Sequence, residues 1–115
     1  MKKFYVASVI VTMVVAFSYC KTAKKAAASP VLFTYETNVK PLVLSSCTPC
    51  HVPGKGGNKK PLDNYESAKA TIDDVVHRIG LSPAEKGFMP FRKEKLSDSA
   101  IAVFNKWKAD GLLEK

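Results

Sequence analysis

The sequence contains no stretch with the strict alternation of apolar and polar residues that marks a half-buried strand, and it contains no internal repeat. It also lacks the length for a second core, because 115 residues with 46% apolar composition suit one small domain once any targeting segment is removed. These absences exclude a sheet, a repeat array and a second domain. We therefore expect a single domain of the all-α class.

Acidic residues are scarce, with ten Asp and Glu against 18 Lys and Arg and a formal net charge of +8 at pH 7. A basic protein can bind nucleic acid, but aromatic and basic residues do not interleave here as a binding platform would require. The apolar run near the N-terminus, which is typical of exported proteins, also argues against nucleic acid. We expect the positive charge to meet an anionic membrane surface or an acidic protein partner, with a merely solvated basic surface as the open alternative.

The chain has one long uncharged apolar run, which extends from Phe4 to Tyr19 and follows two lysines. This arrangement is typical of a secretory signal peptide, here residues 1–19. The run is slightly shorter than the ~17 to 25 residues that cross a bilayer as a helix. We therefore expect export and cleavage, with an uncleaved N-terminal anchor as the alternative.

Cysteine is rare, and the three cysteines leave one thiol of an exported protein without a partner. Cys20 directly follows the apolar run, and the segment resembles a bacterial lipoprotein signal, in which the cysteine after the cleavage site is lipidated. The alternative is that Cys20 is lost or left free after cleavage nearby. Residues 20–33 begin as a basic, alanine-rich stretch, which we interpret as a tether to the domain at 34–115.

Two of the three predicted helices flank the first glycine-rich loop. The first helix should begin near Thr37, because Pro41 is tolerated only in a first turn, and should run into Cys47. The second follows as LDNYESAKATIDDVVHRIG, opened by Asp63 with Glu66 as a capping box and ended by Gly80.

The third helix should occupy the end of the chain. Ser97 can cap it, and Leu96 and Ile101 are spaced as a hydrophobic staple across the cap. Gly111 should close it. The sequence thus predicts the order helix, loop, helix, loop, helix.

Residues 47–51 read CTPCH, and three chemistries compete for them. A redox-active dithiol shares the C-x-x-C spacing, but such motifs need a sheet of βαβ units behind them and no strand is expected here. The single tryptophan, Trp107, also follows Cys47 instead of preceding it. A structural zinc site would need a fourth ligand, for which only His77 and Cys20 remain.

The third chemistry is covalent haem attachment, for which C-x-x-C-H is the recognised signal. Cys47 and Cys50 on a helical turn face the same way, so their sulfurs can add to the two vinyl groups at one edge of a haem. His51 then lies under the iron as the proximal ligand. Export and small size favour this interpretation, because two thioether bonds retain a cofactor that a small domain cannot bury by packing alone.

Methionine is scarce too, and of Met1, Met13 and Met89 only the last should survive removal of the signal. Met89 lies in the loop KGFMPF, where the following proline would stiffen the turn that presents the sulfur. The second axial ligand of a haem decides between electron transfer and small-molecule binding. Met89 as core filler is the alternative, and His77 is a competing ligand that we expect to face solvent.

With these residues, the sequence resembles a class I c-type cytochrome over residues 34–115. The resemblance is carried by NVKPLVLSSCTPCH, by FMPF and by LSDSAIAVFNKWKADGL. It implies a cytochrome c fold, with three main helices around one haem c and the first and last helices packed across each other. It also implies that Pro61 offers its carbonyl to Nδ1 of His51.

The sequence departs from the resemblance at one point. Family members commonly carry a glycine at the helix crossing, and none occurs between Thr34 and Cys47. We interpret Phe104 and Trp107 as core residues of the last helix rather than residues that tune the haem.

We therefore expect a single-haem electron carrier that passes electrons between respiratory partners in the periplasm or on the outer side of a bacterial membrane. His51 and Met89 would ligate the iron, and Cys20 would carry the lipid anchor. The sequence shows no further acid, base or nucleophile constellation, so we expect no enzymatic activity. Basic charge next to the haem motif and Met89 suggests a docking patch for an acidic partner, formed by Lys55, Lys59, Lys60 and Lys93.

Two alternatives stay open. A haem-based sensor or a peroxidase-like protein would have a labile ligand in place of Met89 and would bind a gas or peroxide. A thiol-disulfide oxidoreductase would use Cys47 and Cys50 as a reactive pair.

Overall fold

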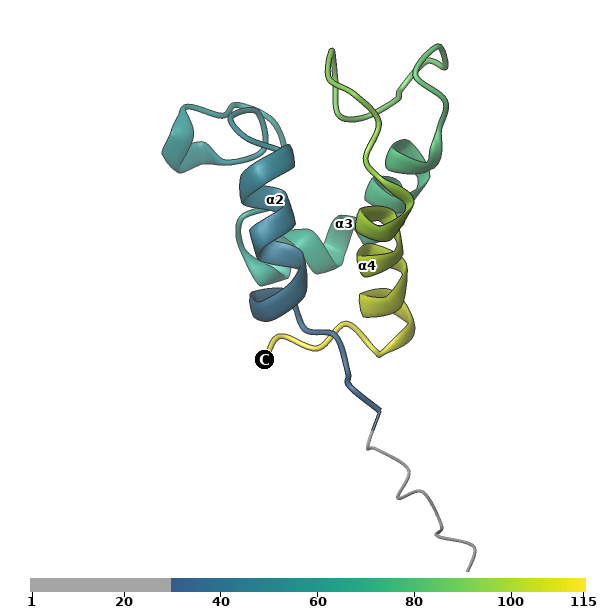
Figure 1. Cartoon of the computed structure of the whole chain (residues 1–115). Coiled ribbons are helices and arrows are strands. Elements are labelled where there is room, and N and C mark those ends of the chain that lie inside the picture. Colours follow the sequence, from purple (N-terminus) through teal and green to yellow (C-terminus); the bar gives the residue numbers. More distant parts are fainter. Residues whose placement is uncertain (1–29) are drawn as a thin grey trace, which may run out of the picture. The chain divides into compact units, whose positions relative to one another are not determined.

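The computed structural model describes residues 30–115, whose helices and loops are drawn in Figure 1. The signal peptide predicted for residues 1–19, lipidation at Cys20 and most of the predicted tether at 20–33 lie outside the described residues. Among the residues that are described, no helix has both the length and the apolar character needed to cross a membrane.

The described chain is built from helices and loops. In order, the elements are a π-helix η2 (Tyr35–Val39), α2 (Lys40–Ser46), a 3-10 turn η3 (Pro53–Lys55), α3 (Tyr65–Gly80) and α4 (Asp98–Ala109). Within residues 30–115 the only extended pairing is one isolated parallel bridge between Thr34 and Leu113. The all-α class predicted from the sequence is therefore confirmed for this part of the chain.

The first helical segment begins earlier than predicted. Pro41 lies in the first turn of α2 as expected, but the π-helix η2 precedes it, and Thr34 caps that turn by accepting a hydrogen bond from the N–H of Thr37. At the junction the N–H of Lys40 bonds to the carbonyl of Tyr35, five residues back. A proline ring clashes with the carbonyl four residues back in a regular helix, and this wider turn relieves that clash. Helical structure therefore continues through the proline.

Asn64, and not the predicted Asp63, caps α3. The Asn64 side chain accepts a hydrogen bond from the N–H of Ser67, and its backbone is extended, as a cap requires. Glu66 is then the second helical residue, so it cannot complete a capping box, which needs the third. The predicted end at Gly80 is confirmed.

Both ends of α4 follow the prediction. The Ser97 hydroxyl accepts a hydrogen bond from the N–H of Ala100, and Leu96 and Ile101 both pack against the core. Gly111 adopts a φ of +93°, a left-handed conformation that favours glycine, and the N–H of Leu112 bonds to the carbonyl of Trp107. The chain therefore turns back over the end of the helix.

An aromatic cluster fills the contact between η2 and α4. Tyr35 and Trp107 are fully buried, with ring centroids 5.9 Å apart, and Tyr65 at the start of α3 lies 6.1 Å from Tyr35. The glycine that the resemblance would place at this crossing is absent, and bulky side chains occupy the contact instead. Phe104 and Trp107 are 2% and 0% exposed, so their interpretation as core residues is confirmed.

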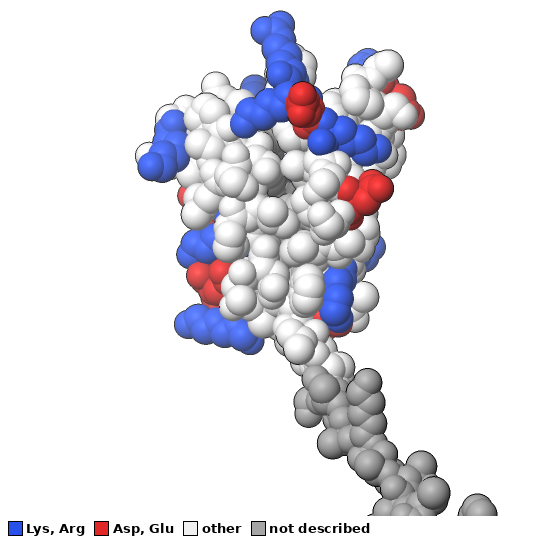
Figure 2. Space-filling view, in the orientation of Figure 1, with Lys and Arg blue, Asp and Glu red and all other residues white. Residues whose placement is uncertain are grey.

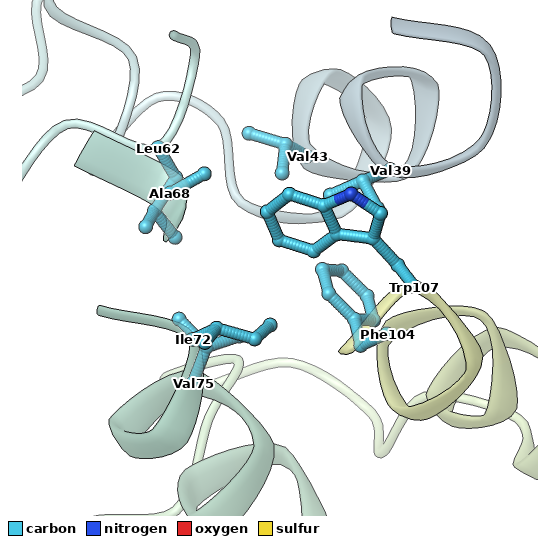
Figure 3. A pocket seen from close by; sticks show the side chains of 8 residues that line it. All are labelled: Val39, Val43, Leu62, Ala68, Ile72, Val75, Phe104 and Trp107. Atoms are coloured by element: carbon cyan, nitrogen blue, oxygen red, sulfur yellow. The ribbon is translucent and has the colours of Figure 1, made fainter. Parts of the chain in front are cut away.

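The core is closely packed beneath the end of the domain that carries the CTPCH turn. A void of about 10 Å³ lies where side chains of α4 face those of the first helical segment and of α3 (Figure 3). Such a void holds no more than one water molecule. Leu62 and Val75 line this void and also a much larger cleft at this end of the domain. The core thus forms the floor of that cleft.

Candidate functional site

A cleft of about 520 Å³ opens at one end of the domain. The segment that follows α2 and the loop between α3 and α4 extend on opposite sides of this end (Figure 1). The cleft is lined by all four side chains that the sequence singled out for haem binding, namely Cys47, Cys50, His51 and Met89. Residues nearly 40 positions apart in the sequence therefore border the same space.

The orientation of His51 is fixed by two hydrogen bonds to the segment around Pro61. Its Nδ1 lies 2.8 Å from the carbonyl oxygen of Lys60, and its own carbonyl accepts a hydrogen bond from the N–H of Leu62 (2.9 Å). A carbonyl bonded to Nδ1 makes that nitrogen the donor and leaves Nε2 as the basic nitrogen. The imidazole is thus held ready to bind a metal through Nε2.

The prediction that Pro61 supplies this carbonyl is wrong by one residue. The groups that bond to His51 are the C=O of Lys60 and the N–H of Leu62, which flank Pro61. In an extended chain these two groups point to the same side, while the carbonyl of the residue between them points to the other. Pro61 has no N–H and a fixed φ, so it holds this segment in shape without accepting the bond itself.

The two cysteines of the turn differ in their surroundings. Cys50 is exposed, while Cys47 is partly buried and packs against the core. Burial raises the pKa of the Cys47 thiol above its ordinary value, and the nearby positive charge of Lys93 opposes that rise only in part. A raised pKa leaves less thiolate, which is the reactive form of a redox cysteine.

Gly57 packs directly against the CTPCH turn. This contact was not predicted from the sequence. A Cβ placed on Gly57 would fall on the carbonyl oxygen of Pro49 and come within 2.6 Å of that of Cys50. Only glycine fits this close approach of two backbone segments. The signal was present as one of three glycines in the loop after His51, but the sequence alone does not tell a packing glycine from a turn glycine.

Met89 lies in a loop that is bonded to α3. Its N–H donates to the carbonyl of Arg78 (3.2 Å), and the Arg78 guanidinium donates to the carbonyl of Gly87 (3.3 Å). The side chain is partly buried, packs against the core and lines the cleft. His77, the competing ligand, is exposed and does not line the cleft, so its predicted solvent-facing position is confirmed.

The cleft is large enough for a cofactor and is lined by residues that carry sulfur and nitrogen ligands. Its volume falls within the ~300 to 1,000 Å³ that is usual for ligand pockets. Apolar side chains, including Leu62, Val75 and Ile79, provide the inner wall, and the two thiols, the imidazole and the thioether are the groups that c-type haem uses. Within residues 30–115 no group of three or more His, Cys, Asp or Glu side chains is placed to hold a metal ion, so zinc finds no ligand cluster there.

Positive charge gathers at the mouth of the cleft. Figure 2 shows a hollow in one face of the domain, below a group of lysine and arginine side chains with an acidic side chain among them. Three of the lysines predicted to form a docking patch, Lys59, Lys60 and Lys93, line the cleft, whereas Lys55 is exposed on η3 and does not line it. The side chain of Lys93, however, donates hydrogen bonds to the backbone carbonyls of Ser46 and Thr48, next to the CTPCH turn.

Comparison of the chain with protein-family models, with curated proteins and with solved structures finds no match.

Proposed function

We propose that the protein is a single-haem c-type cytochrome that carries electrons between respiratory partners outside the cytoplasm. Cys47 and Cys50 would hold haem c by thioether bonds, and His51 and Met89 would ligate its iron. The observation that carries the proposal is that these four side chains, which two separate sequence signals singled out, border one cleft of suitable size. The cytochrome c fold is part of the same proposal.

The residues around the cleft suit this role. When bound, haem supplies an iron that cycles between the ferrous and ferric states. The bond from His51 Nδ1 to the Lys60 carbonyl fixes the ring and leaves Nε2 to bind the iron, as is usual for metal-bound histidines. The thioether of Met89 is a soft, neutral ligand, and methionine together with histidine raises the reduction potential relative to two histidines. With His51 and Met89 both bound to the iron, the protein would transfer electrons without binding a substrate at the metal.

The alternative function, that of a thiol-disulfide oxidoreductase, has less support. A reactive cysteine needs a lowered pKa, whereas burial raises that of Cys47. Such motifs also rest on a sheet, and residues 30–115 contain only an isolated bridge. The exported location and the lipid on Cys20 rest on the sequence of residues 1–20 and remain part of the proposal.

An acidic redox protein is the partner that fits the basic mouth of the cleft. Lys55, Lys59 and Lys60 would form its contact, because long-range attraction between opposite charges speeds association. The rate of electron transfer between the two proteins should then fall as ionic strength rises. A rate that does not change with ionic strength would remove this patch from the proposal.

The experiment that tests the function is intact mass measurement of the protein purified after export, together with thiol titration. We expect the mass of one haem to be added to the chain and no titratable thiol at Cys47 or Cys50. The double variant Cys47→Ser, Cys50→Ser should lack the added mass. A wild-type protein with two free thiols and no added mass would refute the proposal and favour the oxidoreductase.

A further inference from the structure

The loop that presents Met89, residues 81–96, is bonded through its own backbone to one side of the cleft only. That side, or wall, is formed by this loop and α3, and the opposite wall carries the CTPCH turn. The N–H of Met89 bonds to the carbonyl of Arg78, and the carbonyl of Gly87 accepts from the Arg78 side chain. Both bonds lead to α3, which belongs to the same wall as Met89. They hold the loop on α3 but do not hold it near the wall that carries His51.

Lys93 makes the connection across the cleft. Its Nζ donates to the carbonyl oxygen of Thr48 at 2.9 Å and to that of Ser46 at 3.3 Å, 45 and 47 residues earlier in the chain. In the part of the chain that the structure describes, no other hydrogen bond joins residues 81–96 to residues 40–62. Within the described residues, Lys93 is therefore the one side chain that hydrogen-bonds the Met89 loop to the segment that carries the CTPCH turn.

The acceptors of this tie are carbonyls that need a donor. Ser46 is the last residue of α2, and the last turn of a helix leaves carbonyls without an N–H partner. No backbone N–H in the described chain bonds to the carbonyl of Ser46 or Thr48. A lysine ammonium is well suited to this position, because the C-terminal end of a helix carries partial negative charge.

We propose that Lys93 is a positioning residue, which ties the Met89 loop to the CTPCH turn and so keeps the Met89 thioether in the cleft. This proposal rests on the proposed function. Lys93 lies four residues after Met89, and its own N–H bonds to the carbonyl of Pro90. A bond that fixes Lys93 therefore also restricts the movement of the turn that carries Met89. Lys93 is exposed, so water competes with the two carbonyls for its ammonium group. Loss of the tie would give an outside ligand access to the place of Met89.

Lys95 provides a matched control in the same loop. Its Nζ also donates to a carbonyl at a helix end, that of Gly80 at 3.0 Å, but Gly80 lies on α3, the wall to which the loop is already bonded. Replacing either lysine by methionine removes the same charge and a comparable bond. Only the replacement of Lys93 removes hydrogen bonds that cross the cleft to Ser46 and Thr48.

The test is the rate at which cyanide binds to the ferric holoprotein, followed by absorption. We expect Lys93→Met to bind cyanide about tenfold faster than wild type, as suits the loss of hydrogen bonds from a charged donor. Lys95→Met should stay within about twofold of wild type, as for an ordinary surface change. Lys93→Arg, which keeps the charge and the donors, should restore the slow rate. A Lys93→Met rate equal to that of Lys95→Met, or an arginine variant as fast as the methionine variant, would overturn the proposal.

A second measurement does not depend on haem. Hydrogen–deuterium exchange of the amides between residues 84 and 96 should be faster in Lys93→Met than in Lys95→Met, because the loop has lost its tie. Equal exchange in the two variants would also refute the role of Lys93. If wild type carries no haem, the proposed function fails while exchange still tests the tie. If wild type carries haem and the two variants behave alike, only the proposal for Lys93 fails.

Discussion

At the scale of single residues, Gly57 sets how closely the loop after His51 can approach the CTPCH turn. A methyl group at this position would meet the backbone carbonyls of Pro49 and Cys50. We expect Gly57→Ala to lower the free energy of unfolding by about 1 to 3 kcal/mol, the usual cost of overpacking, and to lower the yield of haem-bearing protein. Urea unfolding and the absorbance of the purified protein measure these two effects.

Gly54 is the control for that substitution, because a Cβ there meets nothing within 4 Å. Gly54→Ala should change the free energy of unfolding by less than about 0.5 kcal/mol. Similar losses in the two variants would mean that the loop has no close contact with the turn at Gly57.

Ionisation of the Tyr35 hydroxyl should make the free energy of unfolding depend on pH in alkaline solution. Burial, with smaller effects of Asp63 and Glu36, raises the pKa of its hydroxyl from 10.0 to about 12. The unfolded chain therefore loses this proton before the folded chain does. The stability linked to Tyr35 is complete below pH 10 and is lost as the pH rises from 10 to about 12.

Tyr35→Phe should remove this dependence. The variant lacks the bond from the hydroxyl to the Leu62 carbonyl (2.8 Å), so at neutral pH it should be about 1 to 3 kcal/mol less stable than wild type. The difference between the two proteins should shrink between pH 10 and 12, as measured by urea unfolding at each pH. A constant difference across that range would contradict the raised pKa.

At the scale of elements, the start of α3 offers a direct comparison of two neighbouring residues. Asn64 accepts the capping bond from Ser67, whereas Asp63 precedes the cap. We expect Asn64→Ala to cost about 1 kcal/mol of stability in urea unfolding, and Asp63→Ala to cost clearly less. The reverse order would mean that the helix begins one residue earlier, as the sequence suggested.

The sequence predicted the helices well where their signals were local. Ser97 was identified correctly because Leu96 and Ile101 are spaced as a hydrophobic staple across it, and Gly111 because it is the one glycine at the end of the helix. At the start of α3, two residues that can both cap are adjacent, and the choice depends on which register buries Ala68, Ile72 and Ile79 in the core. The π-helix before Pro41 was not predictable from periodicity, because a wider turn leaves no distinct pattern in five residues.

At the scale of the whole molecule, the end of the chain joins the first helical segment to α4. The carbonyl of Leu113 accepts hydrogen bonds from the N–H of Tyr35 and from the indole N–H of Trp107, both at 2.8 Å. The carbonyl of Glu114 accepts from the N–H of Glu36 (3.1 Å). Two of these donors belong to residues of the buried aromatic cluster.

Removal of residues 113–115 should therefore destabilise the fold far more than its length suggests. Unpaired donors at Tyr35 and Trp107 cost about 1 to 3 kcal/mol each where water does not replace the lost acceptor. Thermal unfolding should show a clear fall in Tm for this truncation, whereas removal of Lys115 alone should leave Tm nearly unchanged. Equal effects of the two truncations would show that the hydrogen bonds at Leu113 and Glu114 contribute nothing.

The residues that line the candidate site were predictable from sequence, whereas the contacts that support them were not. The residue types and spacing in CTPCH identify the side chains themselves, and a lone methionine in a loop identifies Met89. The carbonyl that meets His51 belongs to Lys60 instead of Pro61, because backbone direction in a loop decides it. The role of Lys93 depends on a contact across 45 residues, which no local pattern encodes.

The most direct test of the central claim is the visible absorption spectrum of the purified exported protein, oxidised and reduced. Sulfur bound to ferric haem gives a weak long-wavelength charge-transfer band. We predict this band in wild type and in His77→Ala, and its loss in Met89→Ala. A haem-bearing wild type that never shows the band would contradict ligation by Met89 and would favour a sensor or peroxidase-like protein, or ligation by two histidines.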